Sequence, residues 1–307
     1  MLGLLDSGAN RSPATENGYK KDLNVFSRFL ESTGRENIFL EELTPDLLSA
    51  YVRYLTKDRK SKPNTIRRHV VTLKSFCSFL VNSEYIEQNP AADLQRPRMP
   101  QKLPRFLQKD EVDKLIEAVP ENGSPSMLRD KTVLKCLYYT GVRVSELVSI
   151  QTRDVSLENG FIKILKGKGS RYRKVPLHQR LKEQLQQYLE KAPELSDGYL
   201  FCSKQGSPIT TDYVHYMTEK YADKAGLKKI VSPHTFRHSF ATHLYRKGTD
   251  LFVIGKLLGH VGIRSTSIYI HSELKHLREA VDKLNVSSLL ETEISKIRGR
   301  GDRKGRY

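Results

Sequence analysis

Several residue types that bind anions, exchange protons or act as nucleophiles gather in the last third of this chain. The densest run is His234-Thr235-Phe236-Arg237-His238, which is followed by Leu257-Leu258-Gly259-His260 and by Tyr269-Ile270-His271. Two further segments of this kind lie upstream, TGVRVSEL at residues 140–147 and a glycine-rich stretch around Lys168. Three kinds of chemistry fit such a set of side chains.

The first kind is metal binding. His234 and His238 are four residues apart on an expected helix, so both imidazoles would lie on one face, as in a zinc site. Arg237 beside them opposes a dication, no Glu occupies the HExxH position, and no cysteine is near. The sequence therefore predicts no metal site.

The second kind is a loop that cradles phosphate. The run Gly167-Lys168-Gly169-Ser170 contains a fragment of a P-loop. A P-loop, however, needs the full GxxxxGK[ST] pattern at a junction between a strand and a helix. Here Gly169 follows Lys168 and the context predicts a hairpin, so the P-loop interpretation fails.

The third kind is phosphoryl transfer on DNA without a metal. Arg143 and Arg237 could neutralise the charge that gathers on the non-bridging oxygens of the transition state. The imidazoles of His234 and His260 exchange protons near pH 7. A tyrosine could be a covalent nucleophile, and a lysine at a hairpin tip could protonate the leaving 5′-oxygen. Each of these residues alone is commonly structural, so the interpretation depends on their order and spacing.

That order and spacing resemble a known family. The motifs are TGVRVSEL (140–147), KGKGSRYRKVPL (166–177), HTFRHSFATHL (234–244) and LLGHVGIRSTSIYIH (257–271). They resemble the first arginine motif, the lysine hairpin, the HxxRH box and the LGH…Y box of the tyrosine recombinases of the Xer and phage-integrase type. Residues 15–89 also resemble the helical core-binding domain of that family.

The resemblance implies a role for each matching residue. It implies that Arg143 and Arg237 clamp the scissile phosphate, that His234 assists proton transfer and that His260 hydrogen-bonds a non-bridging oxygen. It further implies that Lys168 is the general acid toward the 5′-hydroxyl and that Tyr269 forms a 3′-phosphotyrosyl link.

The resemblance also covers an acidic position near the first arginine. Glu146 matches this position, and it implies a supporting role in which the carboxylate orients its neighbours. No cofactor, neither ATP nor a metal ion, is implied, because the phosphotyrosyl bond conserves the energy of the broken strand.

Composition agrees with a nucleic-acid partner and excludes several other classes. The chain has 307 residues, 52 Lys and Arg against 35 Asp and Glu, and a formal net charge of +17, which favours a polyanion. No apolar run is long enough to span a bilayer, and Met1–Asn10 lacks a basic secretory n-region. Three cysteines in apolar surroundings predict reduced, buried thiols in a cytoplasmic protein.

The chain is expected to be mainly α-helical, with a small antiparallel sheet and two domains. After a flexible N-terminus at 1–14, apolar stripes predict helices through 15–89, one of them capped at Thr44-Pro45. One helix should begin after Lys62-Pro63-Asn64 and bury Ile66, Val70, Leu73, Cys77 and Leu80. Basic residues predict a DNA-contacting surface on this region and its connector; they are Lys62, Arg67, Arg68, Lys74, Arg96 and Arg98.

The connector and the second domain follow from composition. Four prolines and several basic residues predict a stiff linker at 90–106. Residues 107–285 are expected to form an α+β catalytic domain with a hairpin from 161–165 and 171–177, and a third strand near Val155. The segment 286–307 is expected to be a C-terminal helix and a basic tail.

The resemblance thus implies a site-specific DNA recombinase that acts through a phosphotyrosyl intermediate and a Holliday junction. Its task would be chromosome-dimer resolution, integration and excision, or transposition. Its partner would be a double-stranded recombination site, and four copies of the chain would assemble as a homotetramer on two such sites. Accessory proteins are possible partners, and no membrane is expected. The alternatives are a nicking and resealing enzyme of the type IB topoisomerase kind and a DNA-binding regulator that does not cleave.

Overall fold

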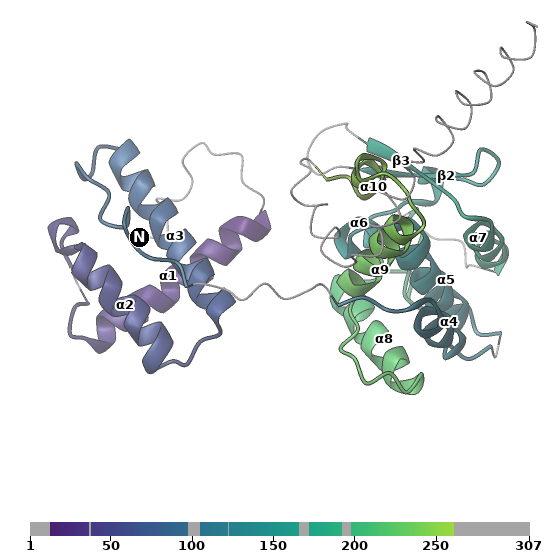
Figure 1. Ribbon diagram of the computed structural model, residues 1–307, viewed down its shortest axis with the longest axis horizontal. Coiled ribbons are helices and arrows are strands. Elements are labelled where there is room, and N and C mark those ends of the chain that lie inside the picture. The colour runs from purple at the N-terminus through teal and green to yellow at the C-terminus, as the bar shows by residue number, and fades with distance from the viewer. Residues whose placement is uncertain are drawn as a thin grey trace, which may run out of the picture. The chain divides into compact units, whose positions relative to one another are not determined.

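The computed structural model describes residues 13–36, 38–97, 105–121, 123–165, 172–191 and 198–260 (Figure 1). The chain divides into two compact units, Met1–Lys102 and Leu103–Tyr307. Each unit has its own hydrophobic core. The predicted class, mainly α with a small antiparallel sheet, is confirmed.

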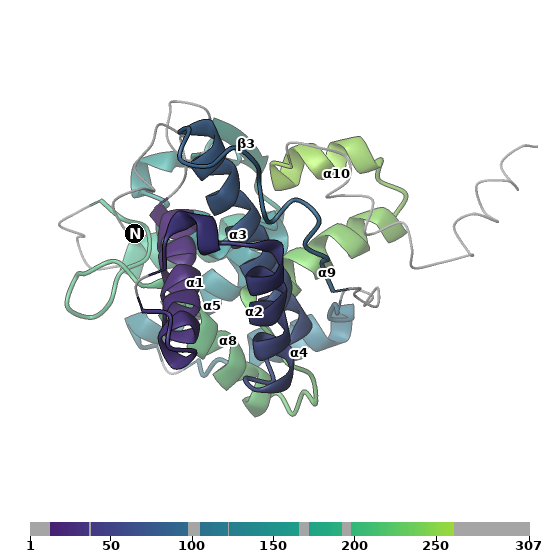
Figure 2. The same cartoon turned by 90° about the vertical axis from the view of Figure 1, so that its left-hand side faces the viewer.

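The described part of the first unit contains the helices α1 (Pro13–Ser32), α2 (Pro45–Lys57) and α3 (Pro63–Asn82), with a short 3₁₀ helix at Leu40–Glu42. The three pack against one another (Figure 2). As predicted, Thr44 caps α2 by accepting a hydrogen bond from the Leu47 amide. The predicted inner stripe of α3 is buried in the same core as Phe26 and Tyr51.

A buried carboxylate joins α1 to α3 in this unit. The Asp22 side chain is 1% exposed and accepts hydrogen bonds from Arg68 Nη2 at 2.6 Å and Thr72 Oγ1 at 2.9 Å. His69 lies beside it, with Nε2 at 3.4 Å from Asp22 Oδ1 and Nδ1 hydrogen-bonded to the Tyr51 hydroxyl at 3.0 Å. The network satisfies a carboxylate that would otherwise be costly to bury.

The first unit extends further than the proline content of the connector suggests. The linker was predicted to start at Pro90, but Ala91 and Leu94 are buried in the core of the first unit. Lys74 Nζ also donates to the Ala92 carbonyl at 2.6 Å. These contacts attach 90–94 to the helices, because two apolar side chains in this segment find a core to enter.

The second unit combines a three-stranded antiparallel sheet with helices. The strands β1 (Val155–Ser156), β2 (Phe161–Leu165) and β3 (Tyr172–Pro176) lie in sequence order, which confirms the predicted hairpin and third strand. The helices described in this unit are α4 (Lys109–Glu117), α5 (Pro125–Thr140), α6 (Val144–Val148), α7 (Gln179–Lys191), α8 (Thr211–Lys224), α9 (Pro233–Arg246) and α10 (Leu251–Leu258). The α9 and α10 helices are in contact, and Ala241, Ile254 and Leu258 form a small buried cluster between them.

Two buried hydrogen-bond networks lie inside this unit. The amide of the buried residue Leu107 donates to Ser239 Oγ on α9 at 2.8 Å, and Ser239 Oγ donates to the Thr235 carbonyl at 2.7 Å. Arg129 and Asp130 form a buried ion pair at 2.8 Å, in which Arg129 also donates to the Cys202 carbonyl and Tyr221 donates to Asp130.

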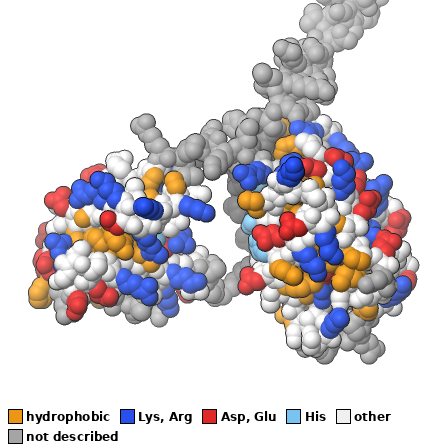
Figure 3. All heavy atoms as spheres, turned by 90° about the horizontal axis from the view of Figure 1, so that it is seen from below, with side chains coloured by type: hydrophobic (Ala, Val, Ile, Leu, Met, Phe, Trp, Pro, Cys, Tyr) orange, Lys and Arg blue, Asp and Glu red, His pale blue; other side chains and the backbone are white. Residues whose placement is uncertain are grey.

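The surface and the thiols agree with the composition. Lys and Arg side chains are spread over the faces seen in Figure 3, interleaved with acidic ones. Cys77, Cys136 and Cys202 are buried free thiols, as predicted. No helix in the described ranges has both the length and the apolar character that crossing a membrane requires.

Candidate active site

The candidate catalytic residues of the described chain stand at helix ends. Arg143 is the N-cap of α6 and follows Gly141, which ends α5 in a left-handed conformation with φ of 60°. His234 and Arg237 lie in the first turns of α9. His260 comes directly after Gly259, which ends α10 with φ of 69°. Three segments that are far apart in the sequence therefore each place a candidate catalytic side chain at or near the end of a helix.

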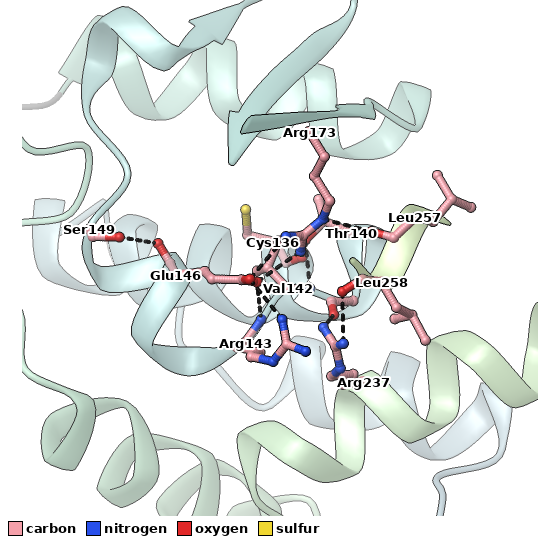
Figure 4. Close-up of polar contacts among 11 residues, drawn as sticks. Cys136, Thr140, Val142, Arg143, Glu146, Ser149, Arg173, Arg237, Leu257 and Leu258 are labelled. Carbon is pink, nitrogen blue, oxygen red and sulfur yellow. Dashed lines mark hydrogen bonds and ion pairs between the residues drawn. The ribbon is translucent and has the colours of Figure 1, made fainter. Parts of the chain in front are cut away.

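Glu146 organises the first of these ends (Figure 4). Its Oε2 accepts the Arg143 amide at 2.8 Å, and its Oε1 accepts Arg143 Nη1 at 3.0 Å. Arg173 on β3 donates Nη1 to Oε1 at 2.9 Å and Nη2 to Oε2 at 2.8 Å. Burial alone would raise the pKa of Glu146, but the hydrogen bonds from Arg173 and Arg143, together with their charges, lower it to about 2. The carboxylate is therefore ionised at neutral pH.

Arg237 donates hydrogen bonds to the C-terminal ends of two helices, α5 and α10. Its side chain is buried, with Nη1 donating to the Gly141 carbonyl at 2.6 Å and Nη2 to the Leu258 carbonyl at 2.8 Å (Figure 4). The carbonyls at a helix C-terminus carry partial negative charge, which a guanidinium stabilises. A Cβ on Gly141 would collide with Phe240 and Leu258, so the close approach of α5, α9 and α10 requires glycine at this position.

The imidazoles of this region are neutral near pH 7. Burial lowers the pKa of His260 to about 4, and the charges of Arg237, Arg143 and Arg173 contribute. His234 is exposed, and its pKa is lowered by partial desolvation, then by His215, Arg237 and Arg143. Histidine side chains reach the surface of the second unit in Figure 3. Neutral imidazoles beside guanidiniums can donate one hydrogen bond and accept another.

The arrangement is suited to an anion with several oxygens. The Arg143 side chain is 41% exposed, whereas Arg237 is buried. The charges of both arginines lower the pKa of His234 and of His260. The sole carboxylate that pairs with Arg143 in the described chain is Glu146, which is shared with a second arginine. Positive charge therefore exceeds negative charge at this site. Within the described ranges, no group of His, Cys, Asp and Glu could hold a metal ion.

Arg173 is a site residue that the sequence analysis did not single out. It belongs to the hairpin motif, and on β3 it is buried like Val175, with exposed residues between and beside them. A charged residue in the inward register of an alternating strand is the signal that could have identified it.

Other predicted site residues lie outside the described residues or in the first unit. Lys168, Tyr269 and Arg98 are outside the described residues. Lys62, Arg67, Arg68 and Arg96 are exposed, and Lys74 is half-buried. Arg68 pairs with Asp22 and Lys74 bonds the Ala92 carbonyl, so both have intramolecular partners.

Comparison with known proteins gives the family. Residues 105–276 match the model "Phage integrase family", and residues 4–95 match "Phage integrase SAM-like domain". The chain is 37% identical over 280 residues to the tyrosine recombinase XerC of Thermodesulfovibrio yellowstonii, covering 89% of this chain and 90% of the relative. It is 33% identical over 274 residues to the tyrosine recombinase XerD of Listeria innocua, covering 87% of this chain and 91% of the relative.

A solved structure agrees with these relatives. The XerH site-specific recombinase, bound to palindromic difH substrate in a post-cleavage complex, is similar with a TM-score of 0.72 at 26% identity. The alignment covers 89% of this chain and 80% of XerH. The chain therefore belongs to the phage integrase family, and it is a tyrosine site-specific recombinase.

Proposed function

We propose that this recombinase cuts and rejoins DNA at a specific double-stranded site through a covalent 3′-phosphotyrosyl intermediate. The observation that carries the proposal is the surplus of positive charge around Arg143, Arg237 and His260, which is held rigidly by helix ends and by Glu146. A DNA phosphodiester is an anion whose non-bridging oxygens gain charge in the transition state. The complex of XerH with its difH substrate supports DNA as the ligand.

In the proposed reaction the tyrosine phenol attacks phosphorus and the 5′-oxygen leaves. A bond forms between the Tyr269 oxygen and phosphorus while the bond from phosphorus to the 5′-oxygen breaks. Lys168 supplies the proton to the leaving oxygen, and His234 assists removal of the phenol proton. Arg143 and Arg237 neutralise the non-bridging oxygens, and neutral His260 donates a hydrogen bond to one of them.

Religation is the same step in reverse, with a 5′-hydroxyl as the attacking group. The phosphotyrosyl bond retains the energy of the cleaved linkage, so the reaction consumes neither ATP nor metal ions. Two rounds of exchange through a Holliday junction need four active sites, and we propose a homotetramer on two DNA sites. The first unit is proposed to bind the core site through exposed cations such as Lys62 and Arg67.

The decisive experiment uses a nicked suicide substrate that loses a short strand after cleavage and traps the covalent adduct. Wild-type protein should form the adduct in EDTA, whereas Tyr269→Phe should form none while it binds the same DNA with unchanged affinity. The proposal fails if wild type forms no adduct on DNA that it binds specifically, or if Tyr269→Phe still forms it. Joining of two sites, as opposed to relaxation of one supercoiled circle, separates a recombinase from a topoisomerase.

A further inference from the structure

A single arginine on β3 contacts two of the segments that carry the proposed catalytic side chains. Arg173 is buried, and its two terminal nitrogens reach the two oxygens of Glu146 on α6. Its Nε donates to the Leu257 carbonyl near the end of α10 at 2.9 Å. One guanidinium thus joins β3 to the α6 segment that Arg143 begins and to the α10 terminus that His260 follows (Figure 4).

We propose that Arg173 is a positioning residue for DNA cleavage, which keeps Arg143 available to the scissile phosphate. This inference rests on the proposed function. Arg173 donates both terminal nitrogens of its guanidinium to Glu146. As a result, Glu146 accepts only one hydrogen bond from the Arg143 side chain. At the same time Arg173 fixes the α10 terminus, and hence the backbone that presents His260.

The hydrogen bonds at Glu146 support this division of roles. The carboxylate accepts from the Arg143 amide, from Arg143 Nη1 and from both terminal nitrogens of Arg173. Four bonds occupy the acceptor capacity of two carboxylate oxygens. Among the described residues, the Arg143 side chain makes one hydrogen bond, so most of its five N–H donors remain for a ligand.

Removal of Arg173 would change this balance. A carboxylate and a guanidinium prefer a bidentate arrangement with two parallel hydrogen bonds. Without Arg173, Glu146 can take Arg143 in that arrangement, which would use a second donor and neutralise the charge that the phosphate needs. Arg143 would then be held in a bidentate ion pair with Glu146 and would be less available to the phosphate. We call this state the capture of Arg143.

The packing around Gly259 shows that the position of Arg173 is tightly specified. A Cβ on Gly259 would lie 2.8 Å from Arg173 Nη1 and 3.0 Å from its Cζ. The backbone before His260 therefore lies directly against the guanidinium, and the bond to the Leu257 carbonyl fixes the same segment from a second direction. A side chain that merely filled space would not supply both directional contacts.

The experiment compares two scissile linkages in the trapped-adduct assay. One is the natural phosphate, and the other is a methylphosphonate in which a methyl group replaces one non-bridging oxygen. The methylphosphonate develops less negative charge, so its cleavage depends less on a free arginine. The measured quantity is the ratio of the single-turnover cleavage rates on the two substrates, with Arg143→Ala as the reference for loss of that arginine.

We expect Arg173→Met to lower cleavage of the phosphate by about tenfold or more, since loss of one preorganised charge-stabilising donor costs about 10²–10³ in rate. Cleavage of the methylphosphonate should fall much less, so the ratio should shift toward that of Arg143→Ala. The matched control is Arg129→Met, which removes a buried arginine from the Asp130 network outside the site. This control should lose thermal stability with an unchanged ratio.

A double variant tests the capture of Arg143 directly. If Glu146 captures Arg143 when Arg173 is lost, Glu146→Gln added to Arg173→Met should restore part of the phosphate cleavage. The proposal is overturned if Arg173→Met keeps the wild-type ratio, or if the double variant is no faster than Arg173→Met. Should Arg173→Met not fold, Arg173→Lys replaces it, and a wild-type ratio in that variant also overturns the proposal. Absence of an adduct with wild type would instead overturn the proposed function.

Discussion

Asp22 in the first unit and Glu146 in the second are both carboxylates held by arginine, but the two arrangements differ in their balance of charge. Asp22 in the first unit pairs with Arg68, and its other partners are a hydroxyl and His69, whose pKa is lowered by burial. Glu146 in the second unit pairs with two arginines, Arg143 and Arg173. The first cluster is neutral and complete, whereas the second retains a positive charge.

The difference separates a cluster that stabilises the fold from one that is ready for a ligand. A buried charge is tolerated when it is paired and hydrogen-bonded, and the Asp22 cluster meets that condition. At the second site the excess charge is stabilised by helix-terminal carbonyls, those of Leu257, Leu258 and Gly141. A phosphate would complete the neutralisation.

The largest expected effect comes from removing each carboxylate in turn. Asp22→Ala leaves Thr72 and His69 without their acceptor, and should lower the free energy of unfolding by about 1–3 kcal/mol. Its adduct-forming rate at saturating DNA should be that of wild type. Glu146→Gln should lower that rate by about tenfold or more, because Arg143 loses its charged support.

Urea unfolding and single-turnover cleavage of both variants measure the two effects. The stability loss of Asp22→Ala is expected to be moderate because the Arg68 side chain is 56% exposed and keeps much of its hydration. If Asp22→Ala slows cleavage at saturating DNA as much as Glu146→Gln does, the distinction between a carboxylate that stabilises the fold and one that supports the active site is wrong.

An intermediate effect is expected at two glycines of the second unit that share a left-handed backbone. Gly259→Ala combines φ of 69° with a Cβ that would meet Arg173, whereas Gly248→Ala combines φ of 81° with open space. Gly248→Ala should cost about 1–2 kcal/mol of stability from backbone strain alone. Gly259→Ala should cost more and should also slow cleavage.

Thermal unfolding measures the loss of stability in the two alanine variants, and single-turnover cleavage measures their loss of activity. Since the backbone strain is matched, the excess effect at Gly259 reports the contact with Arg173. Equal losses of stability with equal cleavage rates would show that this contact contributes nothing.

The last expected effect concerns pH. The pKa of His260 is about 4 in the folded chain, below the value of about 6.5 for an unperturbed histidine. Between these values the unfolded chain binds a proton that the folded chain does not, so this residue makes stability fall as pH drops from about 6.5 to about 4. Above that window it contributes no pH dependence.

An NMR titration of the His260 imidazole measures this directly. In the free protein its midpoint should lie near 4, and binding of a DNA phosphate should raise it because an anion favours the imidazolium form. A midpoint at or above 6.5 in the free protein would contradict the described surroundings of His260.

Local patterns in the sequence predicted the elements well. The cap at Thr44, the inner stripe of α3 and the hairpin of β2 and β3 are governed by neighbours along the chain, so they could be predicted. The motifs also singled out Arg143, Arg237 and His260, and the structure shows these three residues at or near helix ends.

Contacts between distant residues could not be predicted in this way. The partners of Glu146 and Asp22 come from 27 and 46 residues away, in Arg173 and Arg68. Only the folded chain brings these side chains together: the strand register could mark Arg173 as facing inward, but it could not identify Glu146 as its partner. The end of the first unit was misjudged for a related reason, because proline content does not reveal that Ala91 and Leu94 have a core to enter.

The hydrogen bond from Leu107 to Ser239 has a mechanical consequence. It anchors the chain, where it enters the second unit, to the helix that bears His234 and Arg237, and Ser239 is bonded in turn to Thr235 between them. A pull on the chain at Leu107 would therefore act directly on that helix, within one turn of Arg237.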